Sequence, residues 1–298
     1  MKTLAFTILT LLCVCTHATA DTFGSGANQF EIEFVEIGDP GNDADMTGFP
    51  NPAGSVDYIY NIGMFEVSRD MVKKASTEGG LDLTLMDNAG FGGNGPNRPA
   101  TGVTWNEAAR FTNWLNTSRG IPAAYKFSAQ PGDAGYYADA NIELWVDGDP
   151  GFDAANPFRN SQAQYFLPSV DEWYKAAYYD PAAGGYWNFP NGSDTAPMAV
   201  ASGTDPNTAV YDQAFGQGPA DITQAGGVSP YGVMGLGGNV SEWEETAFDL
   251  MNDDGSSFRG VRGGDWDDHP VLLSASARRD KVIPERASAS RRTSSSTS

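Results

Sequence analysis

The order of hydrophobic and polar residues predicts two strands and a short helix in the first part of the chain. Residues 30–37 (FEIEFVEI) alternate apolar and acidic side chains, which is the spacing of a strand. Residues 58–67 predict a second strand or hairpin arm, after an acidic and turn-rich stretch over residues 38–54. Ser68 then stands where a helix N-cap is expected, and we expect that helix to end near Ala75.

Two stronger helices are predicted by capping boxes. Thr104 with Glu107, and Ser169 with Glu172, each place a hydroxyl three residues before a glutamate. In such a box the hydroxyl accepts a hydrogen bond from a free backbone amide, and the glutamate accepts one from the N-cap amide. Apolar residues follow each box at helical spacing and are expected to pack in the core: Trp105, Ala108, Ala109, Phe111, Trp114 and Leu115, then Trp173, Ala176 and Ala177.

Long segments rich in Gly, Pro, Asn and Asp separate these elements, over residues 79–102, 128–164 and 184–231. The chain contains 35 glycines and 18 prolines, so it predicts much loop and modest regular structure. Loops of this length inside a compact domain are often functional or held by a metal ion. Residues 287–298 (ASASRRTSSSTS) are of low complexity and predict a disordered tail.

The N-terminus has the pattern of a signal peptide. Lys2 precedes an apolar run over residues 4–14, and Ala18-Thr19-Ala20 is a small-residue cleavage site. We therefore expect residues 1–20 to be removed and the mature protein to be secreted or periplasmic. The apolar run is shorter than the roughly 20 residues that span a bilayer, and no later stretch is longer, so no membrane insertion is expected.

Removal of this segment takes away both cysteines, Cys13 and Cys15, and leaves His269 as the one histidine. Thiolate chemistry, disulfides and multi-histidine sites are thereby excluded, so neither a copper nor an iron site is expected.

Lys and Arg total 18 against 38 Asp and Glu, a net charge of −20. This charge argues against nucleic-acid binding, which needs cationic side chains, and suits an oxygen-ligated cation such as calcium.

Five segments in order along the chain carry a family resemblance. They are IGMFEVSRDM (62–71), RPATGVTWNEAARFTNWLN (98–116), FLPSVDEWYKAA (166–177), YGVMGLGGNVSEW (231–243) and VRGGDW (261–266). Together they resemble the sulfatase-modifying factor family, also called the formylglycine-generating enzyme family. The resemblance implies a compact α+β domain over residues 21–286, similar to the C-type lectin fold, with little regular secondary structure and long loops. That fold serves both enzymes and hypervariable binding proteins, so it does not by itself give a function.

The chain departs from the family where the enzyme has its thiols. In the enzyme, two cysteines shortly after the R-G-G-S motif bind copper and oxidise a substrate cysteine. An ungapped match from Arg262 puts Asp268 and Leu273 at those positions, and Asp265 replaces the family serine. Neither side chain supplies a soft thiolate for copper(I). The resemblance without its thiols therefore predicts a non-catalytic domain.

The resemblance also implies a calcium site. In the family, a G-N-V-W-E-W turn supplies backbone carbonyls and a glutamate to the ion. Gly238, Val240 and Glu242 match these ligands, whereas Gly235 replaces a ligating Asn or Asp, which weakens a site that needs six to eight oxygens. Asn207 is the candidate for a second family site. The alternative is that Glu242 only caps or pairs locally.

The leading hypothesis is an exported, non-catalytic binding or surface-associated module, stabilised by calcium, whose partner is an unknown protein or carbohydrate. The two later loops and the turn over residues 262–270 are expected to form its ligand face. An exposed loop aromatic would suit a sugar or peptide, whereas a buried one would be ordinary core. The candidate binding residues are Trp187, Trp266, Asp265, Asp268 and His269.

Two alternatives stay open. The first is an enzyme of the same fold, a formylglycine-generating-type oxidoreductase or another, with a non-thiol site around Asp265, Asp267, Asp268 and His269. The second is a truncated, non-functional copy. The family's last strand carries a G-F-R motif and pairs near the centre of the fold, and this chain lacks that motif.

Overall fold

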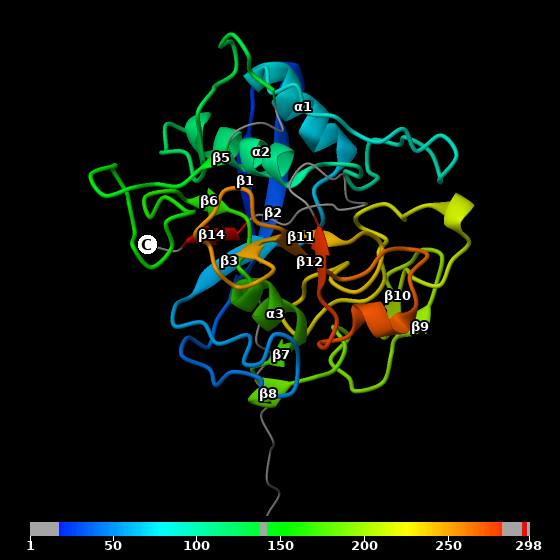
Figure 1. The fold of residues 1–298 in the computed structure, drawn as a ribbon. Coiled ribbons are helices and arrows are strands. Elements are labelled where there is room, and N and C mark those ends of the chain that lie inside the picture. Colours follow the sequence, from blue (N-terminus) through cyan, green and yellow to red (C-terminus); the bar gives the residue numbers. More distant parts are fainter. Residues whose placement is uncertain (1–17, 138–141, 282–293, 297–298) are drawn as a thin grey trace, which may run out of the picture.

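The computed structural model describes residues 18–137, 142–281 and 294–296. Short helices and strands are joined by long loops that wrap around a central region (Figure 1). The predicted α+β class, with little regular structure and long loops, is confirmed. The predicted signal peptide falls almost wholly outside the described residues and stays a prediction.

All three helices in the described part of the chain begin at the predicted N-caps. They are α1 (Arg69–Gly79), α2 (Trp105–Thr117) and α3 (Val170–Tyr178), capped by Ser68, Thr104 and Ser169. Both predicted capping boxes form. The backbone N–H of Thr104 donates to Glu107 Oε2 (2.7 Å), and that of Ser169 donates to Glu172 Oε2 (2.6 Å).

Helix α1 is longer than the sequence predicted. It continues past Ala75 to Gly79, and Gly80 then ends it in the left-handed conformation with φ of 60°. The backbone N–H of Gly80 bonds back to Ser76 O, which closes the last turn. A glycine just past the last turn is the usual C-terminal signal, because it adopts positive φ without steric cost.

The main sheet has five strands in the order β1-β2-β3-β14-β6, and all neighbours are antiparallel. The alternating segment is β2, with Phe30, Ile32 and Phe34 buried and the glutamates between them exposed. The predicted cleavage bond after Ala20 lies inside β1. The strands are β1 (Thr19–Phe23), β2 (Phe30–Ile37), β3 (Tyr60–Gly63), β6 (Tyr165–Phe166) and β14 (Ser294–Ser296).

The structure differs from the expected disordered tail at three residues. Ser294–Ser296 form β14, which pairs with β3 on one side and with β6 on the other (Figure 1). Residues 287–293 and 297–298 lie outside the described part of the chain. Backbone groups make the ladder bonds of a sheet, so a serine run of low complexity can still fill a slot between two strands. The centre of the fold is thus occupied without a G-F-R motif.

A second sheet has the order β11-β12-β13, formed by Glu242–Ala247, Arg259–Arg262 and Arg279–Lys281. Every residue of β11 is buried, although four of its six side chains are polar or charged. Short pairs and 3-10 turns brace the loops: β4 (Lys126–Phe127) with β5 (Ile142–Glu143), β7 (Tyr179–Asp180) with β8 (Gly185–Tyr186), β9 (Met198–Ala199) with β10 (Thr208–Ala209), η1 (Gly26–Asn28), η2 (Phe215–Gln217) and η3 (Pro270–Leu273).

The tryptophans of the helices are core residues, as predicted. Trp105 and Trp173 are fully buried, and Trp114 is 7% exposed. Trp105 Nε1 donates to Glu244 O at 2.9 Å, so α2 is tied directly to β11. No helix in the described residues is long and apolar enough to cross a membrane.

Candidate functional site

The turn before β11 depends on two residues with positive φ. Gly238 has a φ of 89° and Asn239 of 63°. A Cβ atom at Gly238 would lie 2.3 Å from Val210 O, so only glycine fits there. The N–H of Gly238 donates to Gly263 O at 2.7 Å, which joins this turn to the segment that follows β12.

Asn239 holds the turn in place, a role that the sequence analysis did not assign. It is fully buried, and its N–H donates to Val210 O at 2.7 Å. Its side chain donates to Glu66 Oε2 (2.6 Å) and accepts from the N–H of Ala220 (2.7 Å). Its signal in the sequence is its place after the glycine in GGNVSEW, where asparagine tolerates the left-handed conformation.

The predicted calcium ligands differ in whether another group already donates a hydrogen bond to them. Gly238 and Val240 are buried, and no residue in the described part of the chain donates a hydrogen bond to either carbonyl oxygen. Glu242 is fully buried, and its Oε2 accepts from Trp173 Nε1 at 2.5 Å. Two carbonyls and a carboxylate are the hard oxygen donors that calcium prefers, and they supply three of the six to eight it takes. Gly235 adds no side-chain oxygen.

Asn207 lies in another turn, just before β10. It is exposed, has a φ of 60°, and its carbonyl oxygen accepts from the N–H of Met198 at 2.8 Å. Within the part of the chain that the structure describes, no hydrogen bond joins it to the turn over residues 238–242. Its positive φ gives it a local structural role, because asparagine is one of the few residues that tolerate this conformation.

At the first thiol position, Asp268 forms an ion pair. Arg279 donates to both of its carboxylate oxygens, with Nη2 to Oδ2 at 2.7 Å and Nη1 to Oδ1 at 3.4 Å. Arg279 Nη2 also donates to Ser241 Oγ at 2.8 Å, next to the turn over residues 238–242. Burial and the nearby Asp265 raise the pKa of Asp268, and Arg279 opposes that rise.

At the second thiol position, Leu273 is fully buried. It packs with Ala209 and Tyr211 in a small cluster between η3 and β10, and its carbonyl oxygen accepts from Tyr178 Oη at 3.1 Å. A side chain in that place is closed to solvent. The two positions therefore hold a salt-bridged carboxylate and a core leucine.

The expected ligand face is only partly assembled. Trp266 is 1% exposed and donates from Nε1 to Phe215 O at 3.0 Å, so of the two alternatives for a loop aromatic the buried one applies there. Trp187 is half-buried and donates from Nε1 to Asp180 Oδ2 at 3.2 Å.

His269 lies on the surface of that turn. It is 81% exposed, and its Nδ1 is 3.7 Å from Asp212 Oδ1, whose side chain is 59% exposed. This separation is too long for a direct hydrogen bond. Asp265 is half-buried beside Asp268, to which its N–H donates at 2.9 Å. The structure therefore brings Asp265 and Asp268 together and leaves His269 facing solvent.

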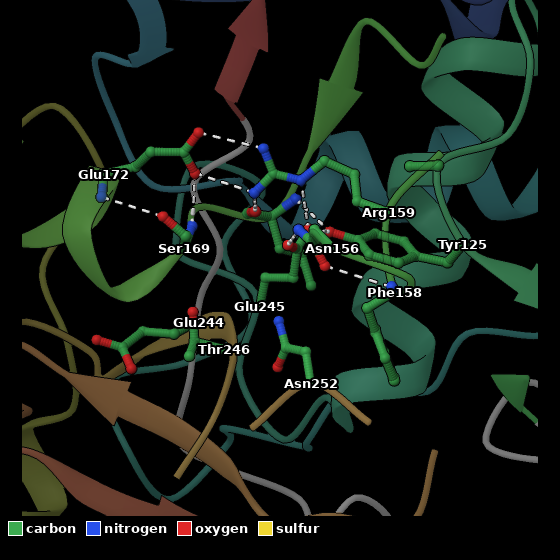
Figure 2. A network of polar contacts seen from close by, with 12 residues as sticks. Tyr125, Asn156, Phe158, Arg159, Ser169, Glu172, Glu244, Glu245, Thr246 and Asn252 are labelled. Atoms are coloured by element: carbon green, nitrogen blue, oxygen red, sulfur yellow. Dashed lines mark hydrogen bonds and ion pairs between the residues drawn. The ribbon is translucent and has the colours of Figure 1, made fainter. Parts of the chain in front are cut away.

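A buried ionic network that the sequence analysis missed connects the loop over residues 128–164 to α3 and β11. Figure 2 shows the guanidinium of Arg159 between two fully buried carboxylates, Glu172 and Glu245. Arg159 Nη2 lies 3.1 Å from Glu172 Oε2, and Arg159 Nε lies 2.7 Å from Glu245 Oε2. Tyr125 Oη also donates to Glu245 Oε2, at 2.8 Å.

The pKa values in this network follow its charges. Burial alone raises the pKa of a carboxylic acid, but the ion pair with Arg159 outweighs it and holds the pKa of Glu172 below its usual value. Burial and the charge of Glu245 together raise the pKa of Tyr125 well above its ordinary range. Glu172 and Arg159 are thus charged at neutral pH, and the phenol of Tyr125 is kept as a hydrogen-bond donor.

The neighbouring residue Glu244 forms a second ionic network, on the other face of β11. Glu244 Oε1 is 2.6 Å from Arg262 Nε, and its Oε2 is 2.7 Å from Arg278 Nε. All three side chains are completely buried. Successive strand residues point to opposite faces, so the pair Glu244-Glu245 divides its charges between two sets of arginines.

These networks are structural in geometry. Their carboxylates accept hydrogen bonds from arginines, tyrosines and a backbone amide. Among the described residues, no group of three or more His, Cys, Asp or Glu side chains is arranged to hold a metal ion. The fold is an α+β scaffold in which the turn over residues 238–242 is joined to the segment after β12, and in which Asp268 and Leu273 stand at the matched thiol positions.

The chain belongs to the sulfatase-modifying factor family. A family model described as "Sulfatase-modifying factor enzyme 1-like domain" matches residues 53–290. The resemblance in the five sequence segments is therefore confirmed. Strands β1 and β2 precede the matched range but belong to the same sheet as β3. No curated protein matches the chain.

Two solved structures are similar in fold. "Treponema denticola variable protein 1" is 19% identical with a TM-score of 0.60, over 93% of this chain and 99% of the other. The protein in "Crystal Structure of CarF" is 18% identical with a TM-score of 0.56, over 90% of this chain and 99% of the other. At these identities the likeness establishes the fold alone.

Proposed function

We propose that this protein is an exported, non-catalytic member of the sulfatase-modifying factor family that acts as a binding module. One observation carries the proposal. The two positions that match the copper-binding cysteines hold Asp268, which is paired with Arg279, and Leu273, which is fully buried. Neither position offers a soft ligand or a thiolate nucleophile, and the mature chain has no cysteine to replace them.

The alternative of a non-thiol enzyme gains no support from the geometry. A base needs a substrate-facing position with a second group to orient it. His269 is exposed and has no hydrogen bond to Asp212, while Asp268 is occupied by Arg279. A surface histidine in an acidic turn is suited to contact a partner.

The decisive test is a turnover assay on the mature protein, residues 21–298. Incubation with oxygen, copper(I) and a cysteine-bearing sulfatase-type peptide is expected to give no oxidised peptide by mass spectrometry. His269→Ala serves as the matched variant. Oxidation of the peptide by the wild-type protein that disappears in His269→Ala would overturn the non-catalytic assignment and establish the enzyme.

We also propose that calcium binds at the turn over residues 238–242, through the Gly238 and Val240 carbonyls and the Glu242 carboxylate. A ligand that binds only the folded state raises the unfolding temperature. Calcium at a hundred times its dissociation constant is expected to add about 2.7 kcal/mol to the free energy of unfolding, measured against a chelator-treated sample.

Glu36→Gln is the control for this measurement, because Glu36 is an exposed glutamate on β2. It should keep the calcium response, whereas Glu242→Gln should lose it. Equal unfolding temperatures of the wild-type protein with calcium and with chelator would refute the site.

A further inference from the structure

A polar hollow of about 210 Å³ lies between the segment after β9, the turn η2 with the residues after it, and the loop before α2. Its lining includes no residue of the turn over residues 262–270 or of the two buried ionic networks, although Trp266 of that turn packs against η2. Five polar side chains line it: Arg98, Ser202, Gln217, Asp221 and Gln224. It is smaller than the 300–1,000 Å³ typical of drug-sized ligands, so it fits a single small ring.

Its side chains keep unused hydrogen-bonding capacity. Gln217 Nε2 is 3.5 Å from Ala201 O, and Gln224 Nε2 donates to Thr223 O at 2.8 Å. No described residue donates to the side-chain oxygen of either glutamine or contacts the hydroxyl of Ser202. A ligand with several hydroxyls, each both donor and acceptor, matches such a set.

The hollow is electrically balanced. Arg98 Nε lies 3.4 Å from Asp221 Oδ1, and Arg98 Nη1 also donates to Pro219 O. One cation and one carboxylate cancel, in a chain whose net charge is −20. A free phosphate or a metal ion would need a surplus of one sign, so the balance favours a neutral ligand.

An exposed aromatic ring stands at the start of the same turn. Phe215 is 57% exposed, although its ring stacks on Trp266 (6.1 Å between centroids) and meets Phe91 edge to face (4.7 Å). Trp266 Nε1 donates to Phe215 O and fixes the turn. An exposed ring held rigidly beside polar groups provides an apolar platform with little entropic cost of ordering.

The walls of the hollow are tied together by backbone bonds. The N–H of Ile222 donates to Asn97 O, and the N–H of Gly203 donates to Gln224 O, each at 2.9 Å. Gly218 has a φ of 70°, and a Cβ there would lie 1.8 Å from Phe91 O, so the two loops touch through their backbones. The site is therefore formed before any ligand arrives.

We infer that this hollow binds a neutral saccharide, with Gln217, Gln224 and the Arg98–Asp221 pair on its hydroxyls. Phe215 lies outside the lining, two residues before Gln217, and would contact an apolar face of a sugar ring that extends beyond the hollow. The inference rests on the proposed binding function and names its ligand class. Direct hydrogen bonds with planar amide, guanidinium and carboxylate groups would fix the orientation of the saccharide. The aromatic ring would add apolar contact area with the sugar.

The test is an array of neutral oligosaccharides of glucose, mannose, galactose and N-acetylglucosamine, together with sulfated and uronic-acid glycans, probed with the mature protein. Hits are then titrated by calorimetry. Gln217→Ala and Gln224→Ala are each expected to weaken a neutral hit about three- to tenfold, the effect of one lost hydrogen bond. Gln162→Ala is the control, because Gln162 is an exposed glutamine in the loop over residues 128–164. It should leave the affinity for the saccharide unchanged.

The outcomes separate this inference from the proposed function. Saccharide binding that survives both glutamine variants, while their unfolding temperatures match the wild type, overturns the hollow as the site but leaves a binding module. Preference for anionic glycans that strengthens in Asp221→Asn overturns the neutral class. Binding to no glycan overturns the inference entirely, while the turnover assay, with its peptide substrate, still decides the proposed function.

Discussion

Replacing Arg159 with leucine is expected to lower the free energy of unfolding by about 3–5 kcal/mol, the usual effect of breaking a buried ion pair by removing one partner. Glu172 and Glu245 are fully buried and both lie against this guanidinium (Figure 2). Without it, two carboxylates stay in the interior with no countercharge. Urea unfolding at pH 7, followed by tryptophan fluorescence, measures the loss.

The effect should depend on pH in a defined direction. Arg159 holds the folded pKa of Glu172 below its usual value, so this stabilisation is present above the unfolded pKa and is lost as pH falls. The gap between wild type and variant should therefore narrow on acidification below about pH 4. Lys74→Ala, which removes a partly exposed ion pair with Asp70 and a surface hydrogen bond to Gln29 O, should cost less than about 1 kcal/mol. A similarly small loss in Arg159→Leu would show that the network is not needed.

Replacing Glu244 with glutamine is expected to be about as damaging, with a loss of about 3–5 kcal/mol. The substitution keeps the shape of the side chain but leaves Arg262 and Arg278 as two buried cations without a carboxylate. One amide oxygen can accept from one guanidinium, while the amide N–H groups face the other. Thermal and urea unfolding at pH 7 measure the change.

Glu36→Gln is the matched control, because it makes the same chemical change at an exposed position of a strand. It should alter stability by less than about 0.5 kcal/mol. Equal effects of the two substitutions would mean that the arginines on this face of β11 find other partners. In Glu244→Gln the strands β11, β12 and β13 should also lose protection from hydrogen exchange, since Arg262 and Arg278 join β11 to β12 and to the segment before β13.

The local parts of the fold could be predicted from the sequence, because their causes lie within a few residues. The N-caps Thr104 and Ser169 each act on a glutamate three residues away, and the alternation in β2 reflects one buried face. The five family segments also predicted the fold class. The end of α1 was missed because the closing residue, Gly80, lies beyond the apolar pattern that suggested an end near Ala75.

The candidate site was less accessible to sequence reasoning, because its contacts are long-range. Arg159 contacts Glu245 across a sequence separation of 86 positions. No local sequence pattern at either residue indicates its partner. The run EWEETA is rich in acidic residues, yet every residue in it is buried, and Glu244 and Glu245 form ion pairs with arginines. Trp266 lies in a turn, yet the turn folds back over it. The polar hollow combines side chains from loops that no periodic pattern describes.

The position of β14 has a consequence for how the chain assembles. Ser294–Ser296 complete a sheet between β3 and β6, which come much earlier in the chain. Until that segment arrives, both strands present unpaired backbone edges, which invite pairing with other molecules. Pairing across so great a sequence separation is also slow, because much chain entropy is lost before contacts form. A product that ends before β14 should therefore misassemble between molecules rather than persist as a smaller, working domain.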